Sequence, residues 1–308
     1  MKSFDHISRR EFLKRSAALG AQTALISSGI GLGVGCGAGC HTTRAGIDLA
    51  VAKGDSPVKN CLAAVEAIGG FPKFVSAGNR VVIKPNPIGR NQPDLATNTH
   101  PDMIEAVIKG CLAAGASEVL VVSHDDLGSM EANGTAAAVE RGGGILKSLM
   151  RQEEYREIVV PRGKILRTEQ VAADVLDADL FINMPIAKHH AATEVTLSMK
   201  NLMGINWDRV FFHQTDLHRC IAELTSLIRQ DLIIMDANHV LMTNGPSGPG
   251  EVHLGRQVIA GVDPVAVDAF TTQAFFREPD RIDHIRIAHE LGVGEIDLAK
   301  LKIHEFEV

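Results

Sequence analysis

Polar side chains gather in this sequence where short apolar runs end. They are Lys84 and Asn86 at the end of 80–84, His124 and Asp125 after 118–123, Lys188 and His190 after 179–184, Asp236 at the end of 232–236, and Asp263 after 258–261. The runs are rich in Val, Ile and Leu, as is typical of buried strands. In open α/β sheets, ligands bind beyond the carboxyl ends of the strands. We therefore expect these side chains to share one edge of a sheet and to line a cleft there.

Two lysines, Lys188 and Lys200, suit the binding of an anion. Lys188 lies beside two histidines, and Lys200 follows in a segment that also holds two threonines. If residues 191–200 are helical, Thr193, Thr196 and Lys200 share one face of that helix. Lysines that converge on a cleft bind a carboxylate or a phosphate. A single lysine more commonly belongs to a solvated surface, so the prediction depends on the cluster.

The cleft also offers groups for acid/base chemistry. His100, His190 and Lys188 are the candidate catalytic residues, because an imidazole titrates near neutral pH and a lysine holds an anionic substrate. The candidate ligand-binding residues are Lys84, Asn86, Lys200, Asn201, Asn244, Asp236 and Asp263. The candidate metal ligands are His124, Asp125 and Asp268, although no H-x-x-x-H or H-E-x-x-H spacing occurs. Asp268 has a second interpretation, because a carboxylate inside a helix also caps or braces neighbouring structure.

The elements that would position these residues alternate between strands and helices. Between the apolar runs, helical periodicity and capping residues predict helices at 101–114, 129–150, 216–229 and 264–276. Such alternation is typical of an α/β fold with a mostly parallel sheet and helices on both faces. No internal repeat or linker interrupts the body of the chain, so we expect a single α/β domain over residues 41–308.

Five stretches of the body together resemble the family known as domain of unknown function 362. They are 81–86, Thr99-His100-Pro101 with the helix that follows, Pro185 to His190, 196–204, and Asn244-Gly245-Pro246 together with 261–268. The resemblance implies the α/β fold and a residue set, but no particular substrate or cofactor. The family usually has Lys-Thr-His where this chain has Lys188-His189-His190, so His190 takes the place of the family histidine. Many members carry a ferredoxin-like module with cysteine motifs, which this chain lacks.

The N-terminus has the features of an export signal. Residues 8–14 read Ser-Arg-Arg-Glu-Phe-Leu-Lys, which matches the twin-arginine pattern S-R-R-x-F-L-K, and a mildly apolar stretch follows. We expect residues 1–40 to direct the folded chain through the twin-arginine translocon to the periplasm or another extracytoplasmic site. Cys36 and Cys40 each follow small residues, as in a lipoprotein signal, so attachment of a lipid at either cysteine is an alternative to release of the exported chain. Such a lipid anchor is the one membrane contact that we expect.

Composition argues against several functions. The formal net charge is −6 and no basic block occurs beyond the N-terminus, so we expect no nucleic-acid partner. Cys61, Cys111 and Cys220 are far apart and form no C-x-x-C, which is unlike a disulfide framework, a zinc site or an iron–sulfur site. Neither the G-x-G-x-x-G loop of dinucleotide-binding proteins nor the P-loop occurs.

Three functions remain open on the sequence alone. The first is an exported enzyme that acts on an anionic small molecule in the Lys/His/Asp cleft. The second is a non-catalytic binding protein, or an accessory partner of a redox enzyme, that uses the same cleft. The third is a metal- or iron–sulfur-dependent redox protein, which the export route favours and the cysteine pattern disfavours. Turnover separates the first from the second, because a binding protein has saturable affinity and forms no product.

Overall fold

The centre of the structure is built from three short strands whose side chains are almost all buried. The computed structural model describes residues 46–308, and these strands are β2 (Arg80–Pro85), β3 (Glu118–Ser123) and β7 (Leu180–Met184). They pair in parallel in the order β7-β2-β3. Their β-branched residues favour extended backbone, and strands buried on both faces are typical of parallel sheets.

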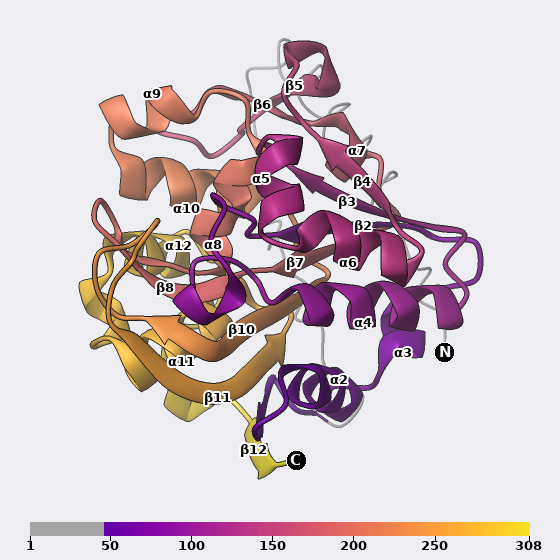
Figure 1. The fold of residues 1–308 in the computed structure, drawn as a ribbon. Coiled ribbons are helices and arrows are strands. Elements are labelled where there is room, and N and C mark those ends of the chain that lie inside the picture. Colours follow the sequence, from indigo (N-terminus) through magenta and orange to yellow (C-terminus); the bar gives the residue numbers. More distant parts are fainter. Residues whose placement is uncertain (1–45) are drawn as a thin grey trace, which may run out of the picture.

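Seven further strands extend this centre into a ten-stranded sheet (Figure 1). They are β1 (Leu49–Lys53), β4 (Ile145–Ser148), β8 (Ile186–His190), β9 (Glu194–Thr196), β10 (Leu232–Leu241), β11 (Val252–Gly261) and β12 (Ile303–Glu307). The order is β12-β1-β11-β10-β7-β2-β3-β4, with β8 paired to both β10 and β9. A separate hairpin consists of β5 (Tyr155–Val159) and β6 (Thr168–Ala172).

Helices cover both faces of the sheet. One face carries α2 (Pro57–Ala67), α4 (Pro101–Ala113) and α6 (Thr135–Gly142), and the other carries α10 (Leu217–Leu227), α11 (Pro264–Phe275) and α12 (Asp283–Glu290). Successive side chains of β2 point to opposite faces of the sheet. Val81 and Ile83 pack in the core beneath α2 and α4, and Val82 packs in the core beneath α10, α11 and α12. The predicted α/β fold, a mostly parallel sheet with helices on both faces, is confirmed.

Short helical segments fill the connections. They are α3 (Phe71–Phe74), α5 (Leu127–Ala132), α7 (Ala173–Leu176), α8 (Ser198–Asn201), α9 (Arg209–Gln214) and the 3-10 helices η1 (Pro93–Leu95), η2 (Gln152–Glu154), η3 (Leu202–Ile205), η4 (Pro279–Arg281) and η5 (Leu298–Lys300). None of the helices in residues 46–308 combines the length and the apolar character that crossing a membrane requires. The predicted signal segment 1–40, including Cys36 and Cys40, lies outside the described residues.

One predicted helix is wrong, and a second segment considered as a helix is not one. The expected helix over 129–150 is two short helices, α5 and α6, followed by strand β4. Gly143 ends α6 with a φ of 78°, a left-handed conformation that favours glycine, and the chain then pairs with β3. The condition that 191–200 is helical is not met, because this segment contains strand β9 followed by the single turn α8. β9 folds back antiparallel on β8, so pairing with β8 outweighs the local pattern.

Candidate functional site

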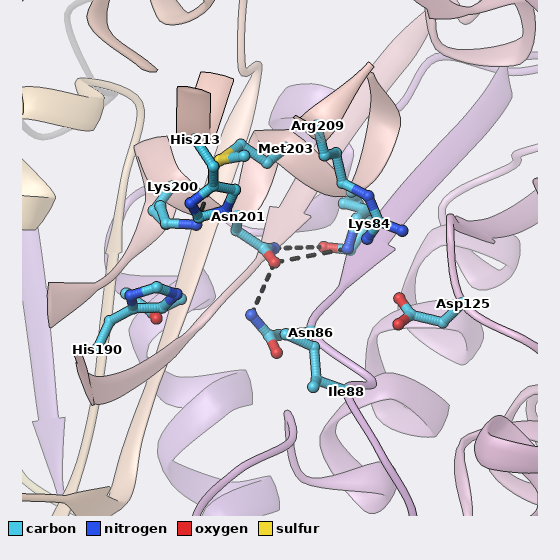
Figure 2. A pocket seen from close by; sticks show the side chains of 12 residues that line it. Lys84, Asn86, Ile88, Asp125, His190, Lys200, Asn201, Met203, Arg209 and His213 are labelled. Carbon is cyan, nitrogen blue, oxygen red and sulfur yellow. Dashed lines mark hydrogen bonds between the residues drawn. The ribbon is translucent and has the colours of Figure 1, made fainter. Parts of the chain in front are cut away.

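A cavity of about 230 Å³ lies beyond the carboxyl ends of β2 and β3 (Figure 2). Its lining residues come from β2 and the loop after it, the loop after β3, strands β8 and β9, and the short helices α8, η3 and α9. They are Lys84, Asn86, Ile88, Asp125, His190, Thr196, Lys200, Asn201, Met203, Gly204, Arg209 and His213. The site is therefore at the edge of the sheet where α/β folds bind ligands.

Three cationic side chains line this cavity. Lys84, Lys200 and Arg209 form no ion pair with any residue in 46–308. Lys84 and Lys200 are only 2% and 8% exposed, so water does little to offset their charges. Asp125 is the one carboxylate that the described residues contribute to the lining, and it accepts a hydrogen bond from Ser123 Oγ at 2.6 Å. The cavity thus has an excess of positive charge.

The two lysines have different hydrogen-bond partners. Lys84 Nζ donates to the carbonyl oxygen of Pro85 and, at 3.5 Å, to Asn201 Oδ1. Lys200 Nζ contacts the thioether sulfur of Met203 at 3.2 Å. A thioether is a weak acceptor, whereas carbonyl and amide oxygens are strong ones. The amino group of Lys84 is therefore held by protein oxygens, whereas that of Lys200 is not.

Burial shifts the titration of the groups around the cavity. It lowers the pKa of Lys84 to about 8. It also lowers the pKa of Lys200 to about 8, and the charge of Arg209 adds to this effect. Burial, followed by the charges of Lys200 and Lys188, lowers the pKa of His190 to about 3. His190 is therefore a neutral imidazole at neutral pH. An anion bound in the cavity would stabilise the ammonium forms of Lys84 and Lys200.

The orientation of His190 follows from its local contact. Its Nδ1 accepts a hydrogen bond from the backbone N–H of Ala192 at 3.1 Å. A neutral imidazole that accepts at Nδ1 carries its proton on Nε2, so His190 Nε2–H is a donor. Thr196, on the adjacent strand β9, also lines the cavity, and its buried hydroxyl has no hydrogen-bond partner among the described residues. Two neutral donors therefore line the cavity together with Lys200 and Lys84.

A chain of side-chain amides includes two lining residues of the cavity, Asn86 and Asn201. Lys188 Nζ donates to Asn86 Oδ1 at 3.1 Å, Asn86 Nδ2 donates to Asn201 Oδ1 at 3.0 Å, and Asn201 Nδ2 donates to Asn183 Oδ1 at 2.7 Å. Figure 2 shows Asn201 bonded to both Asn86 and Lys84. Because each amide donates to the next, all three amides have a defined orientation.

Lys188 itself is not among the lining residues of the cavity. It is 0% exposed, and besides Asn86 its ammonium group donates to the carbonyl oxygens of Thr97 and Pro246 at 2.6 and 3.2 Å. Asn86 and Thr97 belong to the connection between β2 and α4, and Pro246 belongs to the loop between β10 and β11. Lys188 therefore holds the loops together and fixes Asn86, which is a positioning role rather than contact with a ligand.

Asp268, on α11, positions α8. Its two carboxylate oxygens accept from the backbone N–H groups of Ser198 and Met199 at 2.8 and 3.0 Å. It thereby satisfies the first donors of α8, the turn that carries Lys200 and Asn201. Its contacts are those of a helix cap, which was the second of the two interpretations offered by the sequence.

Glycine at position 204 leaves room for the end of the Lys84 side chain. An added Cβ there would lie 2.3 Å from Cε and 2.6 Å from Nζ of Lys84. A larger residue would have to displace the Lys84 ammonium group, so Gly204 maintains the shape of the cavity.

Several predicted site residues lie outside the cavity. His100 begins α4, where its Nδ1 accepts from Asp102 N at 3.2 Å, and its own backbone N–H donates to Asp236 at 2.9 Å. Asn244 donates to the carbonyl oxygen of Pro249 at 2.8 Å in an exposed loop. The structure does not bring His100, Asp236 or Asn244 into the lining.

The prediction that all five apolar runs end at the same edge is wrong for β11. This strand is antiparallel to both β10 and β1, so it ends at the opposite edge of the sheet. Asp263 follows it there and caps α11 by accepting from the backbone N–H groups of Val265 and Ala266 at 2.8 and 3.0 Å. The direction of a strand depends on its neighbours, which its own residues do not specify.

The candidate metal ligands do not form a cluster. His124 Nδ1 contacts the carbonyl oxygen of Asn206 at 3.3 Å, and its ring stacks on Trp207 with centroids 5.4 Å apart. Within residues 46–308, no group of three or more His, Cys, Asp or Glu side chains is arranged to hold a metal ion. Cys61, Cys111 and Cys220 are all buried free thiols, and burial raises the pKa of Cys111 to about 12.

Arg209 and His213 are lining residues that the sequence reasoning missed. They are four residues apart on α9, which places both on one side of that helix. Asp208 begins the helix by accepting from Phe211 N at 2.9 Å. The capping residue Asp208 and the i, i+4 spacing of Arg209 and His213 can both be read from the sequence. The segment lacks the apolar periodicity that predicts a helix, so α9 was not expected.

Comparison with known proteins identifies the family of this chain. The model of the family described as Domain of unknown function (DUF362) matches residues 81–273. This chain belongs to that family. The matched part of this DUF362 protein includes every lining residue of the cavity, from Lys84 to His213.

One relative and two solved structures are similar to this DUF362 protein. Thylakoid-associated protein sll1697 of Synechocystis is 29% identical over 247 residues, which cover 75% of this chain and 73% of the relative. The lactate racemase apoprotein of Thermoanaerobacterium thermosaccharolyticum aligns with a TM-score of 0.46 and 14% identity, over 69% of this chain and 53% of the racemase. A structural-genomics protein of Thermotoga maritima aligns with a TM-score of 0.43 and 13% identity, over 77% of this chain and 60% of its own. This chain thus spans little more than half of either solved chain.

Proposed function

We propose that this protein binds an anionic small molecule, a carboxylate or a phosphate, in the cavity between β2, α8 and α9. The observation that carries the proposal is the set of three cationic side chains, Lys84, Lys200 and Arg209, that line the cavity without an ion pair within residues 46–308. Burying a charge without a partner costs several kcal/mol in free energy. An anion bound among these groups would offset that cost and would be held by charge-assisted hydrogen bonds.

The neutral groups of the cavity would orient the same ligand. The Nε2–H of His190 and the Thr196 hydroxyl would donate to its oxygens, since neither has another acceptor among the described residues. Asp125 would accept from a hydroxyl or ammonium group at the far side of the ligand, which Figure 2 places across the view from His190. A small, polyfunctional anion fits this combination better than a simple inorganic ion.

We expect anions to stabilise the folded protein in a saturable manner. Inorganic phosphate and a series of mono- and dicarboxylates would be added to the full chain at pH 7, and the melting temperature measured at each concentration. A ligand at about 100 times its Kd raises the free energy of unfolding by roughly 2.7 kcal/mol, and salt should weaken the effect. Uncharged amides of the same carboxylates should have no effect.

Two arginine variants serve as matched controls for this measurement. Arg209→Gln removes a charge from the cavity, whereas Arg281→Gln removes one from an exposed site in η4. The anion effect should disappear in the first variant and persist in the second. An equal response in both variants, or no response to any anion in the wild-type protein, would refute the proposal.

We also propose that the chain is exported in folded form by the twin-arginine translocon. The support is the match of residues 8–14 to the signal pattern. Replacing Arg9 and Arg10 with Lys should leave folded precursor in the cytoplasm of a bacterial host, whereas Arg44→Lys should not. Cell fractionation measures the outcome, and normal periplasmic yield of the double variant contradicts the proposal. Loss of membrane-bound protein in Cys36→Ser or Cys40→Ser would identify a lipid anchor.

A further inference from the structure

Lys200 differs from the other buried lysines in the surroundings of its amino group. Lys84 donates to a carbonyl oxygen and an amide oxygen, and Lys188 donates to three oxygens. The hydrogen-bonding contact of Lys200 Nζ is the thioether of Met203, and no carboxylate within the described chain pairs with it. Burial lowers the pKa of all three lysines, that of Lys188 to about 7 and those of the other two to about 8. What distinguishes Lys200 is that its amino group both lines the cavity and donates to no protein oxygen within the described residues.

A neutral amine in a cavity is a nucleophile for carbonyl carbon. Lysines acquire this reactivity when burial or a nearby cation lowers their pKa, and both influences act on Lys200, where burial and the charge of Arg209 lower the pKa to about 8. The amine is also accessible, since Lys200 lines the cavity instead of being enclosed as Lys188 is. Burial and Arg209 also lower the pKa of Lys84 to about 8, but its amino group donates to the Pro85 carbonyl oxygen and to Asn201 Oδ1, so protein acceptors already hold it in place.

The other cavity groups define what kind of carbonyl compound would fit. In Figure 2, Arg209 and Lys84 lie together on one side of Asn201, and Lys200 and His190 lie on the other. The first pair would hold a carboxylate, and the Nε2–H of His190 would donate to a carbonyl oxygen next to Lys200. The Thr196 hydroxyl, buried and without a partner among residues 46–308, is a second donor for that oxygen. A compound with both groups is an oxo acid. In the 2-oxo acids, the smallest compounds of this kind, the carboxylate and the ketone are on adjacent carbons.

We propose that Lys200 forms a Schiff base with a 2-oxo acid bound in this cavity. The inference rests on the proposed function, because the carboxylate is held by the anion-binding groups. The lone pair of Nζ forms a bond to the carbonyl carbon while the carbon–oxygen π bond opens, giving a carbinolamine. The carbon–oxygen bond then breaks, and the oxygen leaves as water with the two protons that the amine nitrogen has lost. No oxidant or reductant is required, and His190 and Thr196 stabilise the oxygen during both steps.

Reductive trapping tests this step directly. The full chain would be incubated with pyruvate or 2-oxoglutarate and treated with sodium borohydride, which reduces an imine to a stable secondary amine. Intact-mass measurement and peptide mapping should show one saturable adduct per chain, located on Lys200. Lactate, which has no ketone, should give no adduct, and acetone, which has no carboxylate, should give at least tenfold less.

Variants separate a reactive lysine from general surface labelling. Lys200→Arg retains the charge but cannot form an imine, so the adduct should disappear. Arg209→Gln should reduce trapping at least tenfold, and Lys59→Met, which changes an exposed lysine, should leave it unchanged. An adduct spread over exposed lysines, or absent from Lys200 in the wild-type protein, overturns the inference even if a variant fails to fold.

A thermal-shift measurement without borohydride distinguishes the two proposals. If both 2-oxo acids raise the melting temperature and neither is trapped, the Schiff base is refuted and the anion site stands. If they neither stabilise the protein nor become trapped, and phosphate and other carboxylates also fail, both proposals are refuted.

Discussion

Replacing Lys188 with Met should lower the free energy of unfolding by about 3 kcal/mol, even though the change removes a fully buried charge. Asn86 Oδ1 and the carbonyl oxygens of Thr97 and Pro246 would all lose their ammonium donor. A buried acceptor left without a donor costs about 1–3 kcal/mol, and methionine supplies no hydrogen for any of the three. Burial lowers the pKa of Lys188 to about 7, so the substitution also relieves a desolvation cost, but we expect this relief to offset only part of the loss of three donated hydrogen bonds.

Urea-induced unfolding, followed by circular dichroism, measures the effect of Lys188→Met. Lys59→Met makes the same change at an exposed position and should leave the midpoint within experimental error. Because Lys188 orients Asn86 within the amide chain, loss of anion binding should accompany the loss of stability. An unchanged or higher midpoint for Lys188→Met would mean that the cost of burying the ammonium group dominates, and the positioning role would have to be abandoned.

The same substitution at Lys200 should have the opposite effect on stability. Lys200→Met keeps the apolar stem and removes an amino group whose hydrogen-bonding contact is the weak acceptor Met203 Sδ, so the free energy of unfolding should be unchanged or up to about 1 kcal/mol higher. Anion affinity should fall about 10- to 100-fold, because a hydrogen bond to a charged group contributes roughly 1.5–3 kcal/mol. Isothermal titration with the tightest-binding anion measures the second quantity.

The pH dependence of stability provides an independent readout for Lys200. Its pKa is lowered from 10.5 to about 8 in the folded protein, so the charged form is destabilising at every pH below about 8. Between pH 8 and 10.5 the unfolded chain binds more protons, and stability therefore rises with pH. Lys84 and Lys188, with pKa values lowered to about 8 and about 7, contribute in the same direction, so Lys200 accounts for only a part of the rise. Lys200→Met should flatten this rise, and a large drop in melting temperature would indicate a structural lysine instead.

Most secondary structure followed from local patterns. The β-branched runs at 80–84 and 118–123 are strands, and the predicted helix at 101–114 is α4, which begins with His100 as its cap and Pro101 in its first turn. These elements could be predicted because periodicity and capping act between residues close in sequence. The same holds for the general position of the site, since the ends of parallel strands meet at one edge.

The local patterns failed where pairing with a distant segment outweighed them. Residues 194–196 are a strand because they pair with β8, and Asp263 lies at the far edge because β11 runs antiparallel to its neighbours. Neither arrangement depends on the residues of the segment alone, because strand pairing is a property of two segments.

The contrast between Lys188 and Lys200 required the folded chain. In the sequence the two lysines are equivalent, and both were expected to hold an anion. The oxygens that surround Lys188 come from Asn86 and Pro246, which are 102 and 58 residues away along the chain, whereas Lys200 contacts Met203, three residues away. The sequence specified that both side chains would be cations near the end of a strand. Whether each cation meets protein oxygens or an open cavity depends on loops brought together by folding, because the desolvation and hydrogen bonding of a charge are set by its neighbours in space.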